Sequence, residues 1–466
     1  MNPPPAVIGF RTLPWRHQRE AVAFVRQLYR RGKRGAMIAA VMGTGKSAMT
    51  VYLSVEEGFQ VILILCPLRV VQVWRPQFEM HSDLPFLVVP LDDSFANVRA
   101  KRAEAERQMT LAKARGVPVV VVINYDSAWR SPFAEWALKQ KWDLVVADEC
   151  HRLKCPGGKA SRYVARLGQA ARFRLGLSGT PMPHSPLDVY AYFRFIDPSI
   201  FGWSFHKFRQ HYAVMGGYHN HQVVGCRNLD ELNRKFYSVT FACGKDVLDL
   251  PAEVHITYTC QLGAEARKVY RSLERDLIAE VRAGEVTAAN ALVKLLRLQQ
   301  ITGGYIRTDE GHDVQIDSAK MNLLRDVLED IAPEEPVVVF CRFHKDLEAV
   351  NRVADETGRR SLELSGRMDE LKRWQAGEAP VLAVQIDSGG VGVDLTRARY
   401  AIYCSLGFSL GSYEQSLARI HRPGQTRPVE YIHLLAEGTV DERVMAALAR
   451  RADVVNTVLH EMKGQA

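Results

Sequence analysis

Short apolar runs that alternate with helical patterns restrict this chain to few folds. Between residues 35 and 200 the runs are Ala36–Ala40, Val61–Leu65, Val119–Ile123, Leu144–Ala147 and Phe173–Leu177. Most of them are nearly continuous in apolar residues, as strands buried on both faces must be. Strands that alternate with helices in this way predict a parallel α/β sheet.

A second set of runs predicts a second sheet of the same kind. Its members are Val337–Cys341, Leu362–Leu364, Val381–Val384, Tyr400–Tyr403 and Val429–Leu434. Between the two sets, residues such as Leu292, Leu295 and Leu296 recur at helical spacing. We therefore expect an α/β fold with one lobe at 1–250, a largely helical insertion at 251–330 and a second lobe at 331–466. Residues 200–250, rich in aromatics and His, are expected to form a small protrusion.

Length and composition set broad limits. The 466 residues suffice for two or three domains, and 47% of them are hydrophobic. The formal charge of +9 mildly favours a polyanionic partner, although a solvated basic surface explains it equally well. We find no signal peptide and no stretch near ~20 apolar residues, so we expect a cytoplasmic protein.

The eight cysteines are scattered, and none forms a C-x-x-C pair. This spacing argues against a disulfide framework and against a structural zinc site. Cys150, His151 and Cys155 lie close together, but no second ligand pair follows at finger spacing. Reduced thiols are the better interpretation.

The clearest motif is a glycine-rich loop at Met42–Ser47, between a predicted strand and a predicted helix. Glycines let backbone N–H groups close around phosphate oxygens, and the helix N-terminus adds partial positive charge. Gly43, Thr44 and Gly45 would line the loop. Lys46 would reach the β/γ-phosphates of ATP, and Ser47 would bind Mg²⁺. The alternative is a glycine turn that caps a core helix.

A pair of acids follows another predicted strand. Asp148 and Glu149 come directly after Leu144–Ala147, at the carboxyl end where ligands of α/β sheets bind. Asp148 would hold Mg²⁺, and Glu149 would polarise the attacking water. The alternative, an exposed acidic turn, is weakened by Lys46 upstream.

These segments resemble a known family. Asp148–His151 looks like the DExH box of superfamily-two helicase-like ATPases, and Leu177–Pro181 resembles their third motif. Gln415–Gln425 resembles the sixth motif in the form typical of Swi/Snf-type DNA translocases. Further matches to that subfamily are Cys66–Leu68 with Trp74, Phe193–Pro198 and Ser388–Leu395. The resemblance spans roughly residues 13–445. Because we recognise no chromatin-reader or accessory domain beside it, we expect a motor of the bacterial or bacteriophage type.

Several positions depart from the family pattern. They are Ala40, where the loop motif has glycine, and Val41, Asp394, Phe408 and Ala418. The resemblance nevertheless implies two RecA-like lobes, an ATP site and double-stranded DNA as partner. It also implies that Arg419 and Arg422, three residues apart, deliver positive charge to the γ-phosphate from one helical face. The alternative for them is a solvated basic helix face.

The remaining assignments are individual. Gln18 resembles the family's adenine-reading glutamine, and Asp394 would contact the nucleotide or merely cap a turn. A translocase holds phosphates rather than bases, so DNA contacts should come from polar and basic side chains. The candidates are Arg69, Ser178, Arg342, Lys345 and Ser388. The stretch around Tyr212, Tyr218 and His219–His221 would either grip DNA or pack within the protrusion.

Two other functions remain open at this point. One is a strand-separating DNA or RNA helicase. The other is a nucleotide-gated scaffold that binds DNA or protein with little turnover. The complete set of Lys46, Asp148, Glu149, Arg419 and Arg422 argues against the scaffold, because a binder need not keep all five. The favoured function is an ATP-dependent motor that translocates on double-stranded DNA.

Overall fold

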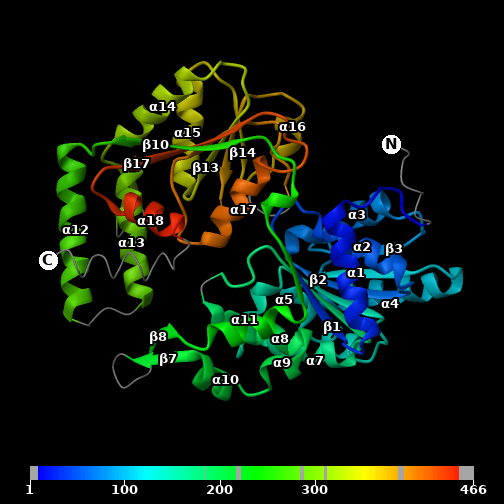
Figure 1. Ribbon diagram of the computed structural model, residues 1–466. Coiled ribbons are helices and arrows are strands. Elements are labelled where there is room, and N and C mark those ends of the chain that lie inside the picture. Colours follow the sequence, from blue (N-terminus) through cyan, green and yellow to red (C-terminus); the bar gives the residue numbers. More distant parts are fainter. Residues whose placement is uncertain are drawn as a thin grey trace. The chain divides into compact units, whose positions relative to one another are not determined.

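The computed structural model describes residues 9–183, 185–216, 222–283, 288–308, 312–386 and 393–450. The chain divides into two compact units, Met1–Leu248 and Asp249–Ala466. Each unit contains a parallel sheet with helices packed around it (Figure 1). The predicted α/β fold with two RecA-like lobes is therefore confirmed.

The first unit contains a seven-stranded sheet in which all neighbouring strands are parallel. The strand order is β3–β4–β2–β5–β6–β1–β9. The strands are β1 (Gly35–Ala40), β2 (Val61–Cys66), β3 (Leu87–Leu91), β4 (Val119–Asn124), β5 (Leu144–Asp148), β6 (Phe173–Ser178) and β9 (Thr240–Cys243). Because only β6 separates β1 from β5, the glycine loop and the acid pair leave the sheet at nearby points of its carboxyl edge.

Helices of the first unit form two packed groups. In one group α1 packs on α2 and α2 on α3, and in the other α7 packs on α8. The helices are α1 (Arg16–Arg30), α2 (Lys46–Glu56), α3 (Trp74–His81), α4 (Val98–Arg115), α5 (Tyr125–Ala128), α6 (Phe133–Ala137), α7 (Lys159–Ala170), α8 (Val189–Ile196), α9 (Pro198–Phe201), α10 (Phe205–Tyr212) and α11 (Leu229–Tyr237). Short 3₁₀ turns are η1 (Leu68–Val73), η2 (Cys150–Leu153), η3 (Pro186–Asp188) and η5 (Lys245–Val247).

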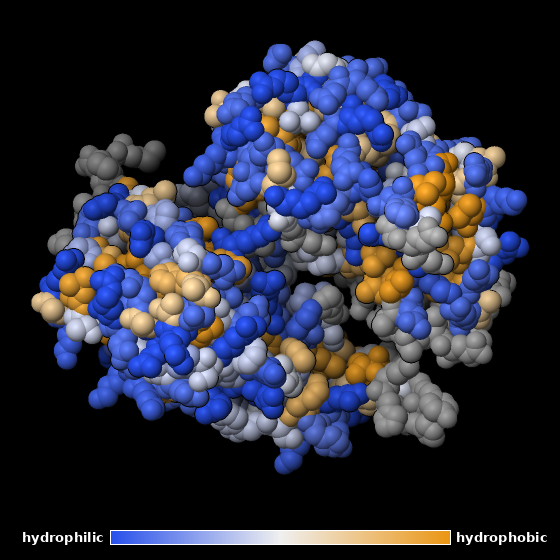
Figure 2. All heavy atoms as spheres, turned by 180° about the vertical axis from the view of Figure 1, so that it is seen from behind, coloured by the Kyte–Doolittle hydropathy of each residue, from blue (hydrophilic) through white to orange (hydrophobic). Residues whose placement is uncertain are grey.

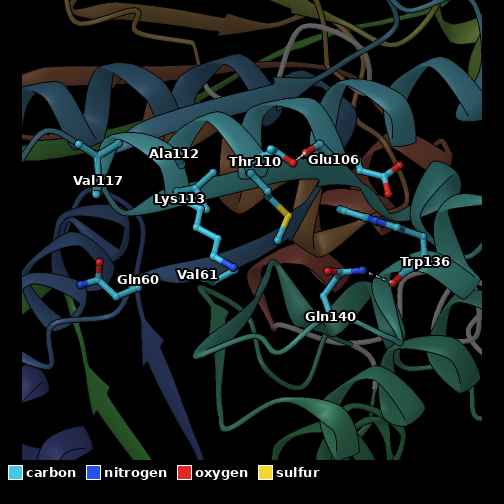
Figure 3. Close-up of a pocket in the computed structure, with 12 residues that line it drawn as sticks. Gln60, Val61, Glu106, Thr110, Ala112, Lys113, Val117, Trp136 and Gln140 are labelled. Atoms are coloured by element: carbon cyan, nitrogen blue, oxygen red, sulfur yellow. Dashed lines mark hydrogen bonds between the residues drawn. The ribbon is translucent and has the colours of Figure 1, made fainter.

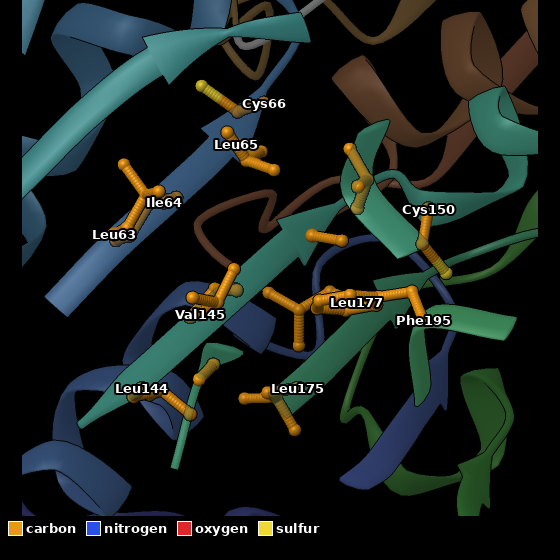
Figure 4. Packing of buried hydrophobic residues seen from close by; sticks show 14 of the residues in the cluster. Leu63, Ile64, Leu65, Cys66, Leu144, Val145, Cys150, Leu175, Leu177 and Phe195 are labelled. Atoms are coloured by element: carbon orange, nitrogen blue, oxygen red, sulfur yellow. The ribbon is translucent and has the colours of Figure 1, made fainter. Parts of the chain in front are cut away.

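The strands that carry the site are buried along their length. Every residue of β1, β4 and β5 is buried. Figure 4 shows Leu144 and Val145 of β5 beside Leu175 and Leu177 of β6 in this core, with Cys150 next to β6. A core of this kind resists small displacements, so it fixes where the carboxyl ends of the strands place their side chains.

The second unit contains a six-stranded sheet, also parallel throughout, in the order β10–β17–β16–β13–β15–β14. Its strands are β10 (Glu253–Cys260), β13 (Val337–Cys341), β14 (Ser361–Leu364), β15 (Val381–Gln385), β16 (Tyr400–Tyr403) and β17 (Val429–Ala436). Its helices are α12 (Ala264–Ala283), α13 (Ala288–Thr302), α14 (Ala319–Asp330), α15 (His344–Glu356), α16 (Leu371–Gln375), α17 (Leu410–Ile420) and α18 (Val440–Ala449). An antiparallel hairpin of β11 (Tyr305–Arg307) and β12 (Asp313–Gln315) follows α13.

Residues 251–330 differ from the separate helical insertion that we expected. They begin with β10, an edge strand of the second sheet, and the whole stretch belongs to the second unit. Most side chains of β10 are exposed, so this strand carries no apolar run that would reveal it in the sequence. The rest of the stretch is largely helical, as expected.

Residues 200–250 contain two helices, a hairpin and a strand that joins the first sheet. An antiparallel hairpin of β7 (Ala213–Gly216) and β8 (Gln222–Cys226) follows α10, and β9 pairs with β1. Tyr212 is buried, and its ring packs against Phe201 and Phe208. Internal packing therefore explains Tyr212, whereas Tyr218 and His219–His221 lie outside the described residues.

On the face drawn in Figure 2, hydrophilic residues cover most of the surface and hydrophobic ones lie in separate patches. Among the residues that the structure describes, no helix is both long and apolar enough to cross a membrane.

Candidate active site

The loop between β1 and α2 has the backbone shape that its glycines permit. Gly43 and Gly45 have φ values of 86° and 81°, which residues with a side chain rarely adopt. A Cβ on Gly45 would lie 2.4 Å from Nε2 of Gln18. Helix α2 begins at Lys46, so the unpaired N–H groups of its first turn adjoin the loop. This geometry is typical of an anion site at a helix N-terminus.

Two side chains stabilise the loop by hydrogen bonds to its own backbone. The Lys46 ammonium donates to the carbonyl oxygens of Ala40 at 2.8 Å and Val41 at 3.4 Å. The Thr44 hydroxyl donates to Val41 O at 2.7 Å. Ala40, which replaces the expected glycine, is the last residue of β1 and is fully buried. The substitution therefore lies in the strand and leaves the Gly43–Lys46 end of the loop unchanged.

Two residues of α1 support the same loop. Gln18 Nε2 donates to the carbonyl oxygen of Thr44 at 3.0 Å, and His17 Nε2 lies 2.9 Å from that oxygen. Both side chains are buried, and Gln18 Oε1 accepts from the Trp15 amide at 2.9 Å. In this structure Gln18 thus braces the loop. Sequence reasoning missed His17, although its neighbour Gln18 was singled out.

Asp148 is the last residue of β5 and is nearly inaccessible to solvent. Burial, together with the negative charge of Glu149, raises the pKa of its carboxyl group to about 7, while the nearby charge of Lys46 opposes the shift. Its Oδ1 accepts from the Glu149 amide at 3.0 Å. A carboxylate that is buried this deeply and interacts with the Lys46 ammonium is well suited to bind a cation.

Glu149 has an unusual backbone and an unsatisfied side chain. Its φ of 51° and ψ of 49° are in the left-handed region, which is uncommon for a residue other than glycine. Within the described parts of the chain its buried Oε2 has no hydrogen-bond partner, although His151 Nδ1 lies 3.4 Å away, and Oγ1 of Thr180 has none either. Buried polar atoms of this kind normally have partners, so they fit a site completed by water, phosphate or metal. Hydroxyl and carboxylate oxygens such as those of Ser47 and Asp148 are the donors that Mg²⁺ prefers.

The third motif contributes a buried serine. Ser178, at the end of β6, is fully buried, and its hydroxyl accepts from the Thr180 amide at 3.1 Å. The same hydroxyl lies 2.9 Å from Nδ1 of His151. This position favours a link between the two motifs over the DNA contact that we expected from Ser178.

In the second unit, the prediction that Arg419 and Arg422 share a helical face is wrong. Helix α17 ends at Ile420, and His421 leaves the helix with φ of −91° and ψ of 82°. Arg419 therefore lies in the last helical turn and Arg422 beyond it. The Arg422 guanidinium donates to Val393 O at 3.5 Å, and its buried Nε has no partner among the described residues.

The turn after α17 is braced by two residues of the sixth motif. His421 Nε2 lies 2.7 Å from Pro251 O. Gln425 Nε2 donates to the carbonyl oxygens of Thr396 at 3.1 Å and Ala398 at 2.8 Å. Both side chains are buried, so these residues fix the position of the Arg422 backbone. Sequence reasoning had assigned them no separate role.

Asp394 fits the second interpretation given to it. Its side chain is exposed, and its Oδ1 accepts from the Thr396 amide at 2.9 Å and the Thr396 hydroxyl at 2.7 Å. It therefore caps a turn in this structure. A nucleotide contact by Asp394 remains an untested prediction.

The other DNA candidates occupy different environments. Arg69 is exposed in η1, and Lys345 is exposed and paired with Glu348 at 2.7 Å. The Arg342 guanidinium makes a cation–π contact with Phe408, 4.4 Å from the centre of the ring. Ser388 lies outside the described residues.

A hollow of about 510 Å³ lies between α4, α6 and the starts of β2 and β4 (Figure 3). Gln60 and Val61 line it from the start of β2, and Lys113 from α4. These are the amino ends of the strands, opposite to the edge that carries the glycine loop. The hollow is therefore separate from the glycine loop and the acid pair. Within the described parts of the chain, no group of three or more His, Cys, Asp or Glu residues is arranged to hold a metal by itself.

Relatives of this chain include phage, bacterial and animal proteins. The putative protein p41 of Acyrthosiphon pisum secondary endosymbiont phage 1 is 27% identical over 91% of this chain and 94% of its own length. The chromodomain-helicase-DNA-binding protein 1-like of Danio rerio is 25% identical over 92% of this chain, and the putative ATP-dependent helicase/translocase YwqA of Bacillus subtilis is 24% identical over 91%. The chain spans only 42% and 46% of the lengths of these last two proteins.

Among solved structures, the Sulfolobus solfataricus SWI2/SNF2 ATPase core in complex with dsDNA is similar over 97% of both chains, with 20% identity and a TM-score of 0.45. The helicase conserved C-terminal domain matches residues 319–424. The SNF2-related domain matches residues 17–304. Since the match to the SNF2-related domain covers more than half of this chain, the chain belongs to the SNF2-related family.

Proposed function

We propose that this protein is a DNA-dependent ATPase that moves along double-stranded DNA, and that it works in the cytoplasm, which is that of a bacterial host if a phage encodes the protein. The observation that carries the ATPase assignment is the carboxyl edge of the first sheet. There the loop with Lys46, the buried Asp148 and the unsatisfied Glu149 Oε2 leave the sheet on strands separated only by β6. A nucleotide-gated scaffold has no need of an unsatisfied carboxylate beside its phosphate loop.

Each residue of this edge has a separate task in the proposal. The amides around Gly43–Gly45 and the Lys46 ammonium bind the phosphates, which requires Lys46 to exchange its carbonyl partners for phosphate oxygens. Ser47 and Asp148 would hold Mg²⁺, an ion that would supply positive charge beside the phosphates. Glu149 Oε2 accepts a hydrogen bond from the attacking water. Arg419 and Arg422 add positive charge from the second unit.

Duplex DNA is proposed as the track because the family includes proteins named for DNA binding and because the chain is basic. Such binding should be driven by phosphates and independent of sequence. Its affinity should fall linearly with salt on a log–log plot, with a slope of about −0.9 per phosphate contact. Strong preference for one sequence over its scramble would contradict this.

The strand-separating helicase remains the second candidate, because the first unit contains the antiparallel hairpin β7–β8, labelled in Figure 1, and a hairpin could act as a wedge. Opening a duplex costs about 1.4 kcal/mol of stacking per step, which a motor that only grips phosphates need not supply. Two assays under the same conditions separate the candidates. Triplex displacement on a blunt duplex should succeed with ATP, and unwinding of a forked duplex should fail. Efficient fork opening without triplex displacement would establish the helicase.

A further inference from the structure

A second hollow in the first unit, of about 530 Å³, has a different chemical character from the active site. It lies between α7 and the segment that includes α6. Three cations of α7, Lys159, Arg162 and Arg166, line it together with the indole of Trp129. Glu135 is the acidic residue in its lining. None of these residues belongs to the ATP site or to the DNA contacts considered above.

The cations share one face of α7 because they are spaced three and four residues apart. All three are exposed. The opposite face of the helix is buried, with residues such as Val164 and Leu167 in the core of the unit. Helix α7 therefore presents a rigid basic row from a fixed backbone.

The indole of Trp129 lies among the cations. The Lys159 ammonium is 5.1 Å from the centre of its ring, and the guanidinium of Arg130 is 5.4 Å away. These cation–π contacts keep two charges beside an aromatic surface that is only half-buried. A ligand that binds here could therefore contact the positive charges and the Trp129 ring at the same time.

No ion pair among the described residues neutralises this group. The salt bridges of the first unit involve none of Arg130, Lys159, Arg162 and Arg166. By contrast, Arg102 and Arg107 on α4 are each paired with a glutamate of the same helix. The three cations that line the hollow, with Arg130 beside the Trp129 ring, repel one another, and an anionic ligand would reduce that repulsion.

We propose that this hollow is an additional nucleic-acid site, which binds the phosphodiester backbone through Arg162 and Arg166 and stacks a sugar or base on Trp129. Arginine favours phosphate because its planar fork matches the oxygen geometry. Basic grooves with interleaved aromatic rings are the usual design of surfaces that hold nucleic acid without reading its sequence. An acidic protein segment would use the cations but has no need of the indole.

The inference rests on nucleic acid being a partner of this protein, as proposed above. The test uses the full chain with Arg162→Glu and Arg166→Glu combined. Fluorescence anisotropy with a labelled duplex and with a labelled single strand is measured over a range of salt concentrations. A charge-matched control combines Arg99→Glu and Arg115→Glu, two exposed positions of α4. A conservative variant combines Arg162→Lys and Arg166→Lys.

If the duplex is the ligand, the salt slope should decrease by about 1.8 in the Arg162/Arg166 reversal, since each phosphate contact contributes about 0.9. If a single strand is the ligand, its slope should decrease by about 1.4, from about 0.7 per contact. The lysine variant should keep most of the slope, and ATP turnover without nucleic acid should be unchanged in all three variants. Equal losses in the α4 control would overturn the proposal, as would unchanged slopes with both nucleic acids or displacement by polyglutamate at lower charge concentration than by DNA. If the unaltered protein binds neither nucleic acid, the proposed function fails as well.

Discussion

Nδ1 of His151 lies 2.9 Å from the hydroxyl oxygen of Ser178, so the segment after the acid pair is tied to the end of the neighbouring strand. His151 also has its Nδ1 3.4 Å from Oε2 of Glu149. Burial lowers the pKa of His151, which keeps the ring neutral and lets it both donate and accept hydrogen bonds. A movement of Glu149 can therefore be transmitted through His151 to the loop that begins at Ser178.

This contact should carry the response to DNA. In Ser178→Ala we expect DNA to stimulate ATP turnover several-fold less than in the unaltered protein, with a smaller effect on turnover without DNA. Ser54→Ala is a matched control, because Ser54 is equally buried and bonded to Thr50 O within α2. Both variants should lose about 1 kcal/mol of stability, as is usual for one hydrogen bond. Equal DNA stimulation in the two variants would exclude the proposed path.

Substitutions of Lys46 and Glu149 should impair different steps, nucleotide binding and ATP hydrolysis. Lys46→Ala removes a positive charge beside the phosphates, so nucleotide binding should weaken. Glu149→Gln keeps the size of the side chain but loses the charge that polarises water, so ATP should still bind while hydrolysis stalls. Equilibrium binding of a fluorescent ATP analogue and single-turnover hydrolysis separate the two effects. Loss of binding in Glu149→Gln would count against its role as the water-polarising residue.

The fold was predictable wherever burial leaves a signature in the sequence. Runs such as Val119–Ile123 and Val337–Cys341 are strands because both faces of each sheet are covered, which demands continuous apolar residues. Strands at sheet edges were missed for the opposite reason. β10 is largely exposed, and β3 is interrupted by Pro90, a residue tolerated at an edge.

The site was predictable where the chemistry is local in sequence and unpredictable where it depends on long-range contacts. The loop at Gly43–Lys46 forms from adjacent residues, so its motif identifies it. The contact between His17 and Thr44 and the contact between His151 and Ser178 each join residues that are 27 positions apart. The end of α17 at Ile420 was missed because His421 is drawn toward Pro251 and Glu253, contacts that no local pattern encodes.

Mg²⁺ binding should depend on pH through Asp148. Its pKa of about 7 means that the carboxyl is largely protonated at pH 6 and largely ionised at pH 8. Because the metal requires the carboxylate, Mg²⁺ affinity should rise over this range and protons should be released on binding. Titration of ATPase activity with Mg²⁺ at pH 6, 7 and 8 measures this, and Asp148→Asn should abolish the trend.

The same carboxyl should lower the stability of the metal-free protein as pH rises. Between the unfolded pKa near 4 and the folded pKa near 7, the folded state keeps a proton that the unfolded state releases. The free energy of unfolding contributed by Asp148 therefore falls through this window and is constant above it. Thermal melting without metal should show that Asp148→Asn stabilises the protein more at pH 8 than at pH 5. The reverse order would contradict the raised pKa.

A buried ion pair in the second unit should show a non-additive effect on stability. The Lys320 ammonium contacts Asp441 Oδ2 and lies 3.5 Å from the Thr302 hydroxyl, and all three side chains are buried. Lys320→Met leaves the carboxylate buried without its partner, which should cost about 3–5 kcal/mol. The double variant Lys320→Met/Asp441→Leu should recover much of this loss. Chemical denaturation of the four proteins gives the coupling, and simple additivity would show that the pair is not an interacting unit.

Arg422 should be needed for turnover but not for ATP binding. It lies beyond the end of α17, where the buried His421 and Gln425 on either side hold the backbone in place. In the part of the chain that the structure describes, its guanidinium makes one long contact, to Val393 O, and Nε has no partner, which leaves donor capacity for a phosphate. An arginine that stabilises the charge of phosphoryl transfer is typically worth ~10³-fold or more in rate. We therefore expect Arg422→Ala to retain nucleotide affinity and lose turnover on that scale. Arg427→Ala serves as the control, because Arg427 follows shortly after Arg422 in the chain but is already paired with Glu335 at 2.8 Å. Normal turnover in Arg422→Ala would remove Arg422 from the active site and with it the proposal that the second unit completes the chemistry of the first.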